Sequence, residues 1–324
     1  MMRIHSILLF SLAWLTLFSS CDQSFDPRVA SEPLPIIYSV LATDRSQQFV
    51  RIYTQYDSSS VVPSSKAIEI PITDAIVSLY DESNVTVLSD TTMPRPSDSR
   101  YQTPIHAYVT GALKVEHGGR YTLSVQSNAI GYASAAAVVP NQPLIYLNGD
   151  EFLDSPFDFS EETKATINVY LQPGAKGYVL RLNLCYDILE QDGWKRKQEE
   201  IPVSFKTKPF KYEQALYALV TKVNSVPAVV QTYANANYRL MLGEISARTS
   251  TEKTIFNYVV VQFVQFEENL YNYYNVVSGF RDQFSLRLDQ ASYSNLSGGT
   301  GLFGAYAVDS LVHILPYDFI YNRR

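Results

Sequence analysis

The sequence predicts a mainly β protein, in which an immunoglobulin-like β-sandwich over residues 36–140 is followed by a second β-rich domain over residues 141–324. The composition favours strands, because 24 tyrosines accompany 16 phenylalanines and aromatic residues suit the half-buried positions of a sheet. Segments in which apolar and polar residues alternate recur along the chain, and 16 prolines and 14 glycines supply turns between them.

The first domain is predicted from a series of short strands separated by turn residues. Gly118-Gly119 marks one turn, and Pro140 closes the last strand of the series. Roughly seven strands at this spacing are typical of an immunoglobulin-like sandwich. The clearest strands are expected at residues 36–41, 50–56, 75–79, 121–125 and 133–139.

The second domain is also predicted to be rich in strands. Its clearest strand runs from Tyr178 to Ile188, where every second residue is apolar. Asp192-Gly193 then predicts a hairpin turn, so a return strand is expected over 194–206. Further strands are expected at residues 255–266, 284–288 and 306–314.

Two helices are predicted within this second domain. The first is expected near residues 211–225, because apolar residues from Tyr212 to Val223 recur at helical spacing before Pro227. The second is expected near residues 267–279, where Leu270, Tyr274 and Val277 share one face and Gly279 ends the helix.

The N-terminus predicts export and lipid anchoring. Residues 1–20 have the pattern of a signal peptide, and their apolar stretch is too short and interrupted for a membrane span of roughly 20 residues. Residues 17–21, Leu-Phe-Ser-Ser-Cys, resemble a bacterial lipobox, which implies cleavage before Cys21 and acylation of its thiol. Two or more acyl chains hold a protein firmly at a membrane. Residues 21–35 are then a tether; the alternative is an ordinary signal peptide followed by an unmodified cysteine.

Charge and cysteine content narrow the partners and the covalent chemistry. The formal net charge is −6, which argues against nucleic acid as a partner, since phosphate binding needs a basic surface. The second cysteine, Cys185, lies on an apolar segment and has no partner for a disulfide if Cys21 is acylated. We expect it to be a buried small hydrophobic residue.

The sequence contains no recognisable catalytic residues, metal site or cofactor motif. Outside the signal peptide the histidines are His106, His117 and His313, and their spacing suits no zinc site. Residues 299–304 match GxGxxG, yet a dinucleotide site needs a complete βαβ unit around that motif. We interpret Gly298–Gly304 as a glycine-rich turn at which two backbones approach closely, and expect no enzyme activity.

Residues 293–306, Tyr-Ser-Asn-Leu-Ser-Gly-Gly-Thr-Gly-Leu-Phe-Gly-Ala-Tyr, resemble the closing motif of a Bacteroidota lipoprotein family catalogued as domain of unknown function 4249. The tyrosine-rich segment 268–274 is similar to the family's helix just upstream of that motif. The sequence departs from the family between Gly279 and Tyr293, where Phe284 is present without an adjacent proline. The resemblance extends to the strands at residues 74–79, 119–125 and 137–140.

The resemblance implies an accessory lipoprotein of a TonB-dependent transporter. Such a protein is attached to the outer membrane through Cys21, faces the periplasm or the cell surface, and captures ligand or caps the transporter. A second hypothesis is a free-standing surface module that binds glycan or peptide, with Tyr271 and Tyr273 as stacking residues. A hydrolase is the third, and it would require a deep pocket with convergent carboxylates or a histidine.

Overall fold

The computed structural model describes most of the chain beyond the expected tether, and in this part strands predominate. The mainly β prediction is therefore confirmed. The signal peptide and Cys21 lie outside the described residues, as does the strand expected at 284–288. The structure describes residues 34–54, 70–95, 103–147, 164–206, 214–224, 228–249, 254–278 and 293–314.

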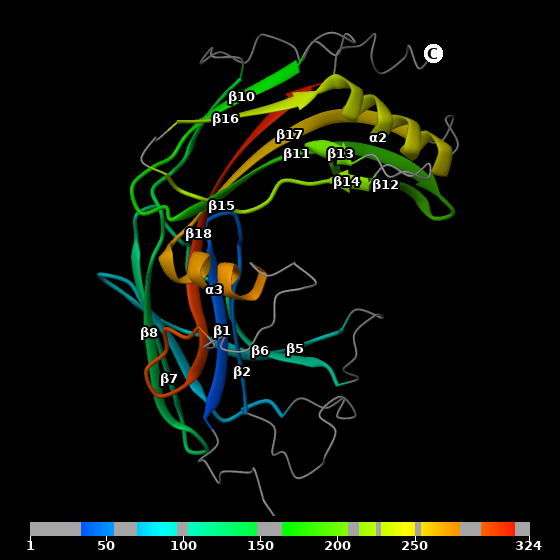
Figure 1. Ribbon diagram of the computed structural model, residues 1–324. Coiled ribbons are helices and arrows are strands. Elements are labelled where there is room, and N and C mark those ends of the chain that lie inside the picture. Colours follow the sequence, from blue (N-terminus) through cyan, green and yellow to red (C-terminus); the bar gives the residue numbers. More distant parts are fainter. Residues whose placement is uncertain are drawn as a thin grey trace, which may run out of the picture.

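The first half of the chain forms one β-sandwich (Figure 1). Strands β1, β2, β6 and β5 form one layer, and β4, β3, β7 and β8 form the other. The bounds are β1 (Pro35–Ala42), β2 (Gln48–Thr54), β3 (Ile76–Tyr80), β4 (Val85–Val87), β5 (Ser89–Met93), β6 (Ile105–Thr110), β7 (Arg120–Ser127) and β8 (Gly131–Val138).

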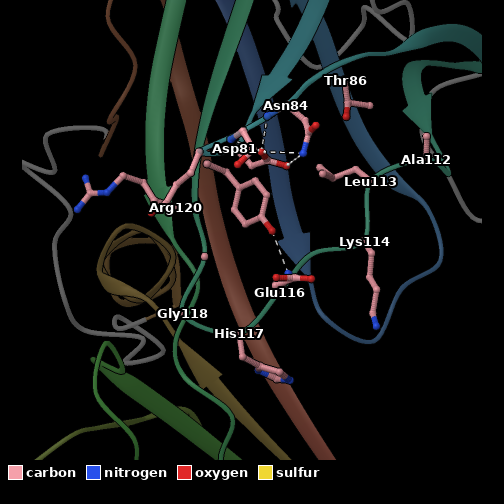
Figure 2. Close-up of a pocket in the computed structure, with 14 residues that line it drawn as sticks. Asp81, Asn84, Thr86, Ala112, Leu113, Lys114, Glu116, His117, Gly118 and Arg120 are labelled. Carbon is pink, nitrogen blue, oxygen red and sulfur yellow. Dashed lines mark hydrogen bonds between the residues drawn. The ribbon is translucent and has the colours of Figure 1, made fainter.

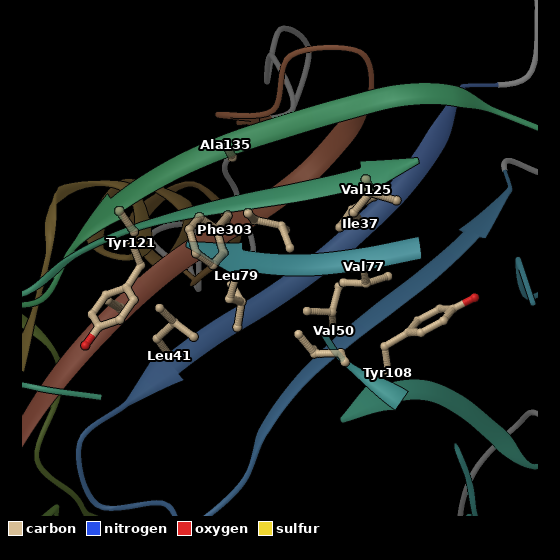
Figure 3. Packing of buried hydrophobic residues seen from close by; sticks show 14 of the residues in the cluster. Ile37, Leu41, Val50, Val77, Leu79, Tyr108, Tyr121, Val125, Ala135 and Phe303 are labelled. Atoms are coloured by element: carbon tan, nitrogen blue, oxygen red, sulfur yellow. The ribbon is translucent and has the colours of Figure 1, made fainter. Parts of the chain in front are cut away.

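The core of this sandwich is filled by alternate residues of the facing strands (Figure 3). In β7, for example, Tyr121, Leu123 and Val125 are buried while the residues between them are not. This period of two is the pattern that the sequence shows, because neighbouring side chains on a strand point to opposite faces. The labelled members of the core are Ile37, Leu41, Val50, Val77, Leu79, Tyr108, Tyr121, Val125, Ala135 and Phe303.

Tyr121 also fixes the connection between β6 and β7. Its hydroxyl accepts a hydrogen bond of 2.9 Å from the backbone N–H of Glu116, while its ring is buried. We predict that Tyr121→Phe lowers the free energy of unfolding by about 1–2 kcal/mol, because the Glu116 N–H loses its acceptor. Urea denaturation measures the loss; Tyr217→Phe, at a half-exposed site, is the control. Equal stability of the two variants would contradict this role.

The second half of the chain forms another pair of layers (Figure 1). Strands β12, β11, β17 and β18 lie side by side, and β16, β10 and β9 form a separate sheet that shares their core. The bounds are β9 (Leu144–Leu147), β10 (Lys164–Tyr170), β11 (Gly177–Glu190), β12 (Gly193–Glu200), β13 (Ser204–Lys206), β14 (Gln214–Leu216), β15 (Thr221–Lys222), β16 (Ala228–Ala234), α2 (Asn235–Arg248), β17 (Thr254–Phe266), α3 (Glu268–Ser278) and β18 (Thr300–Ile314).

Strand β18 joins one layer of the first sandwich to one layer of the second, so that these two layers form one continuous sheet. Residues 300–306 pair in parallel with β1, and residues 306–314 pair in antiparallel with β17. The sequence placed this strand in the second domain, yet Phe303 lies in the core of the first sandwich. Residue 140 is therefore not a boundary between separate sheets. Periodicity shows which face of a strand is buried but does not identify the neighbouring strand, which explains the difference.

The prediction of a helix near residues 211–225 is wrong. Within its described part, residues 214–216 form β14, which pairs with β13, and residues 221–222 form β15, which pairs with β11. Leu216 and Leu219 are 40% and 61% exposed. Their helical spacing thus produces no buried face, and packing of such a face is what stabilises most helices.

The helix predicted near residues 267–279 is confirmed as α3, whereas α2 was not predicted. Apolar and polar residues are mixed around α2, so the sequence shows no helical stripe there. It is held in place by single contacts such as buried Ile245 and the side-chain amide of Asn237, which donates to the Val203 carbonyl at 2.8 Å. The return strand expected over 194–206 is divided in the structure. Strand β12 ends at Glu200, two residues before Pro202, which cannot donate to a ladder, and residues 204–206 form β13, which pairs with β14 instead.

Candidate interaction surface

The outer face of the β4-β3-β7-β8 sheet exposes large apolar side chains. We call this surface the outer face and define it by the outward residues of those four strands, namely 76, 78, 80, 85, 87, 120, 122, 124, 126, 132, 134, 136 and 138. Exposed patches of this kind mark interaction sites more often than scattered apolar residues do. The large apolar members are Ile76 (63% exposed), Tyr80 (38%), Val85 (57%), Val87 (63%), Tyr132 (59%) and Val138 (37%).

Strand register places these side chains beside small hydroxyl residues. Tyr80 lies between Val85 and Thr122, and Ser78 lies between Val87 and Ser124. Ser124 in turn pairs with Ser134. Among the residues that define the outer face, Arg120 alone carries a charge, and it stands at the start of β7. Apart from Arg120 the surface is therefore uncharged, with apolar groups and hydroxyls that could contact a partner without the cost of burying charge.

A polar hollow of about 680 Å³ adjoins the outer face where β3 ends and β7 begins (Figure 2). The turn between β3 and β4 forms one side of it, and the connection from β6 to β7 forms the other. Its charged lining residues carry both signs, and Arg120 belongs to the hollow and to the outer face. An apolar centre beside a charged rim is the usual anatomy of a protein interface. The acidic, basic and histidine residues of the lining are Asp81, Glu82, Lys114, Glu116, His117 and Arg120.

The acidic side of the hollow is built by Asp81. Its Oδ1 accepts hydrogen bonds from the backbone N–H groups of Ser83 at 2.8 Å and Asn84 at 2.7 Å (Figure 2). Both hydrogen bonds lower the pKa of the Asp81 carboxyl, and the bond from Ser83 has the larger effect. The turn is thus closed by its own aspartate, as in an Asx turn, and this carboxylate stays charged at neutral pH.

The structure places the predicted stacking residues Tyr271 and Tyr273 in packing positions. Both are half-buried on α3. Tyr271 covers Gly177 so closely that a Cβ there would lie 2.2 Å from its ring. Tyr273 meets Tyr38 edge to face, with ring centroids 5.8 Å apart, and burial raises its pKa. These two rings therefore support α3 against the sheet and do not form an exposed row.

The exposed tyrosines of the outer face, Tyr80 and Tyr132, were not singled out from the sequence. For Tyr80 a signal exists in the sequence of β3. Ile76 and Tyr80, which point to one side of the strand, are apolar, and so are Val77 and Leu79, which point to the other side. A strand with one buried face normally has polar residues on its second face. Apolar residues in both phases therefore indicate a second surface that takes part in contacts.

The remaining residues considered from the sequence do not gather into one site. His106 lies on β6, His117 in the hollow and His313 on β18. In the described ranges, no three His, Cys, Asp or Glu side chains are placed to share a metal ion. Cys185 is a buried free thiol, as predicted, and its burial raises its pKa.

The glycine-rich motif is a place where backbones approach closely, as predicted, but it is not a turn throughout, because β18 begins at Thr300 and residues 300–304 pair with β1. Gly298 and Gly301 have φ of 76° and 120°. A Cβ on Gly298 would lie 2.2 Å from the Tyr132 carbonyl oxygen, and one on Gly301 would lie 2.0 Å from that of Ile37. The motif thus brings the start of β18 against both layers of the first sandwich, through β8 and β1.

The fold and the surface define a class, a two-sandwich β protein with a largely uncharged outer face and a polar hollow beside it. The chain belongs to the family described as Domain of unknown function (DUF4249), whose model matches residues 22–311. No curated protein matches its sequence. Among the described residues, no helix has the length and apolar character that crossing a membrane requires.

One solved structure with a local likeness is the C-terminal globular domain of an oligosaccharyltransferase from Pyrococcus abyssi. It is 12% identical, with a TM-score of 0.23, and the match covers 71% of this chain and 46% of that one. The chain thus spans less than half of that structure. A likeness at this TM-score and identity says nothing about the function of this chain.

Proposed function

We propose that the protein is a non-catalytic accessory lipoprotein of the outer membrane, which uses its outer face to hold a TonB-dependent transporter and assists in ligand capture. The observation that carries the proposal is the largely uncharged, apolar and hydroxyl-rich outer face beside a charged hollow. The lipobox resemblance around Cys21 supports the membrane address in this proposal, and the resemblance to outer-membrane accessory lipoproteins supports the choice of partner.

The first sandwich suits a binding role. Its layers β1-β2-β6-β5 and β4-β3-β7-β8, together with the Tyr121 hydrogen bond at the β6–β7 corner, support an immunoglobulin-like arrangement. Many cell-surface binding domains share this architecture. The outer face is built on strands that pair with one another, and a surface that is preformed in this way reduces the entropy cost of binding.

A lipid anchor on Cys21 would leave the folded part of the chain free to reach a neighbouring protein. The first described strand begins at Pro35, so the segment from Cys21 spans at most about 50 Å, at roughly 3.3–3.6 Å per residue. A diacylated Cys21 would restrict the protein to the membrane surface. Restriction to that surface raises the effective concentration of the protein beside a transporter in the same membrane.

A pull-down from the native host tests this proposal. A C-terminally tagged protein is recovered from detergent-solubilised outer membrane, beside Cys21→Ala and the double variant Val87→Glu/Tyr132→Glu. We expect the wild type to recover a transporter, and the double variant to recover at least about tenfold less, because two charges would be buried in the contact. Val230→Glu, on the exposed side of β16, is the matched control and should recover as much as the wild type.

The outcomes separate the hypotheses. Loss of the transporter with the double variant, but not with Val230→Glu, supports docking through the outer face. Equal recovery by all variants would contradict the role of this face. Recovery of the wild-type protein alone from the membrane fraction would contradict a stable complex. It would favour the second candidate, a free-standing glycan- or peptide-binding module, for which the exposed rings of Tyr80 and Tyr132 are the specific observation.

A further inference from the structure

A second hollow, of about 300 Å³, lies at the opposite end of β6 from the polar hollow. The end of β2, the segment 71–73, strand β5 and the start of β6 surround it. Its volume is at the small end of the range for ligand pockets, roughly 300–1,000 Å³. The residues that line it are Arg51, Ile52, Tyr53, Pro71, Thr73, Thr92, Thr103, Pro104 and His106.

Two residues that line this hollow each carry a polar side-chain atom that is buried and has no hydrogen-bond partner in the described part of the chain. The two atoms are Nδ1 of His106 and Oγ1 of Thr103. The His106 side chain is only 8% exposed, and its ring packs edge to face on Tyr108 at 5.3 Å between centroids. Buried polar groups are nearly always paired. Two such atoms on residues that line one hollow therefore indicate that a ligand supplies their partner.

The lining groups define the chemistry of that ligand. The hydroxyls of Thr73, Thr92 and Thr103 can donate hydrogen bonds, Arg51 adds a positive charge, and the lining contains no Asp or Glu. The carboxylate of Asp90 lies 3.9 Å from Nε2 of His106 and is largely exposed. The imidazole tautomer that carries a proton on Nδ1 can donate a hydrogen bond to a ligand from that nitrogen.

We propose that this hollow binds the carboxylate of a small molecule with a compact apolar body. The carboxylate accepts from His106 and Thr103, and the apolar body packs on Pro71 and Pro104. A free short-chain organic acid and the C-terminal residue of a peptide share this chemistry. The inference rests on the ligand-capture part of the proposed function and names the ligand class, but it requires no transporter.

Calorimetric titration of the purified full-length lipoprotein in detergent tests the proposal. The probes are acetate, butyrate, hexanoate and N-acetylvaline, with 1-butanol as the neutral counterpart of butyrate. We expect saturable binding at one site, and at least about tenfold weaker binding of 1-butanol, since hydrogen bonds to a carboxylate are the stronger kind. Tighter binding of N-acetylvaline than of the free acids would identify a peptide C-terminus as the source; the reverse order would identify an organic acid.

Variants locate the site. Thr103→Val, which keeps the shape of the side chain, and His106→Leu should each weaken binding about tenfold or more. Thr232→Val, at an exposed position on β16, should bind like the wild type. If His106→Leu does not fold, Thr103→Val decides. The proposal is overturned if folded wild type binds none of the acids, if 1-butanol binds as tightly, or if Thr103→Val binds unchanged. The pull-down of the transporter is independent of each of these results.

Discussion

Gly301→Ala is expected to lower the free energy of unfolding by about 3–5 kcal/mol or to prevent folding. Gly301 opens β18, where it pairs with Ile37 of β1. Its φ of 120° suits few residues other than glycine, and a Cβ would lie 2.0 Å from the Ile37 carbonyl oxygen. Backbone strain of about 1–3 kcal/mol thus adds to the cost of forcing two paired strands apart, also about 1–3 kcal/mol.

Two other glycines separate these contributions. Gly131 has φ of 71° with no atom within 4 Å of a Cβ, so Gly131→Ala measures the conformational cost alone, about 1–2 kcal/mol. Gly243 lies within α2 with the same open space, and alanine there should stabilise by about 0.5–1 kcal/mol. Urea denaturation gives all three values. A loss at Gly301 no larger than that at Gly131 would show that the close approach to Ile37 has no energetic role.

Glu267→Ala is expected to cost about 3–5 kcal/mol, because three backbone N–H groups lose their acceptor at about 1–3 kcal/mol each and water can replace only part of this. Glu267 is 3% exposed and precedes α3. Its Oε1 accepts from Leu270 at 2.8 Å and Ala305 at 3.3 Å, and its Oε2 accepts from Asn269 at 2.7 Å. One side chain thus caps the helix and ties it to β18.

The same residue should make stability depend on pH. Burial raises the pKa of the Glu267 carboxyl, although the three N–H groups oppose the shift. The folded protein therefore holds this proton to higher pH than the unfolded chain does. The stability that this difference in pKa contributes is fully present at pH values below the pKa of Glu267 in the unfolded chain. It is lost as the pH rises through the pKa of Glu267 in the folded protein.

Glu267→Gln tests this dependence, because glutamine is neutral at every pH. Its Oε1 can still accept from Leu270 and Ala305, and only the bond from Asn269 is lost, at about 1–2 kcal/mol. Urea denaturation of wild type and Glu267→Gln between pH 4 and pH 7 should show the difference between them shrinking as pH rises. A constant difference would contradict the titration of Glu267 in this range.

The strands could be predicted from the sequence wherever one face is buried and the other is polar. The alternation from Tyr178 to Ile188 predicts most of β11, and the alternation at residues 121–125 predicts β7. Periodicity assigns a face to each side chain and leaves the neighbouring strand open. The parallel pairing of β18 with β1, in which Thr300 pairs with Ile36 from the other end of the chain, therefore could not be predicted.

Helices were less predictable for a related physical reason. Helical spacing of apolar residues near 211–225 stabilises a helix only if that face packs, and Leu219 is exposed instead. In α3 the same spacing coincides with a buried cap at Glu267 and with ring contacts by Tyr271 and Tyr273. Local pattern and tertiary contact agree there, and the prediction succeeds.

The candidate surfaces depend on neighbours that only the fold provides. His106 has no sequence neighbour that suggests a site; the hollow appears because β2, β5 and β6 bring Thr92, Thr103 and Arg51 around it. The outer face likewise arises from the register of four strands. Tyrosine content indicated that aromatic contacts matter, but it could not distinguish Tyr132, which is exposed, from Tyr273, which packs.

The most direct test of the proposed function is site-specific photocrosslinking in living cells of the native host. A photoreactive amino acid is placed at Tyr132 on the outer face, or at Val230 on the sheet that contains β16, and the crosslinked product is identified by mass spectrometry. If the outer face holds the transporter, we expect a crosslink to a TonB-dependent transporter from position 132 and none from position 230. No transporter adduct from position 132, at wild-type abundance in the membrane, or equal adducts from both positions, would contradict this role of the outer face.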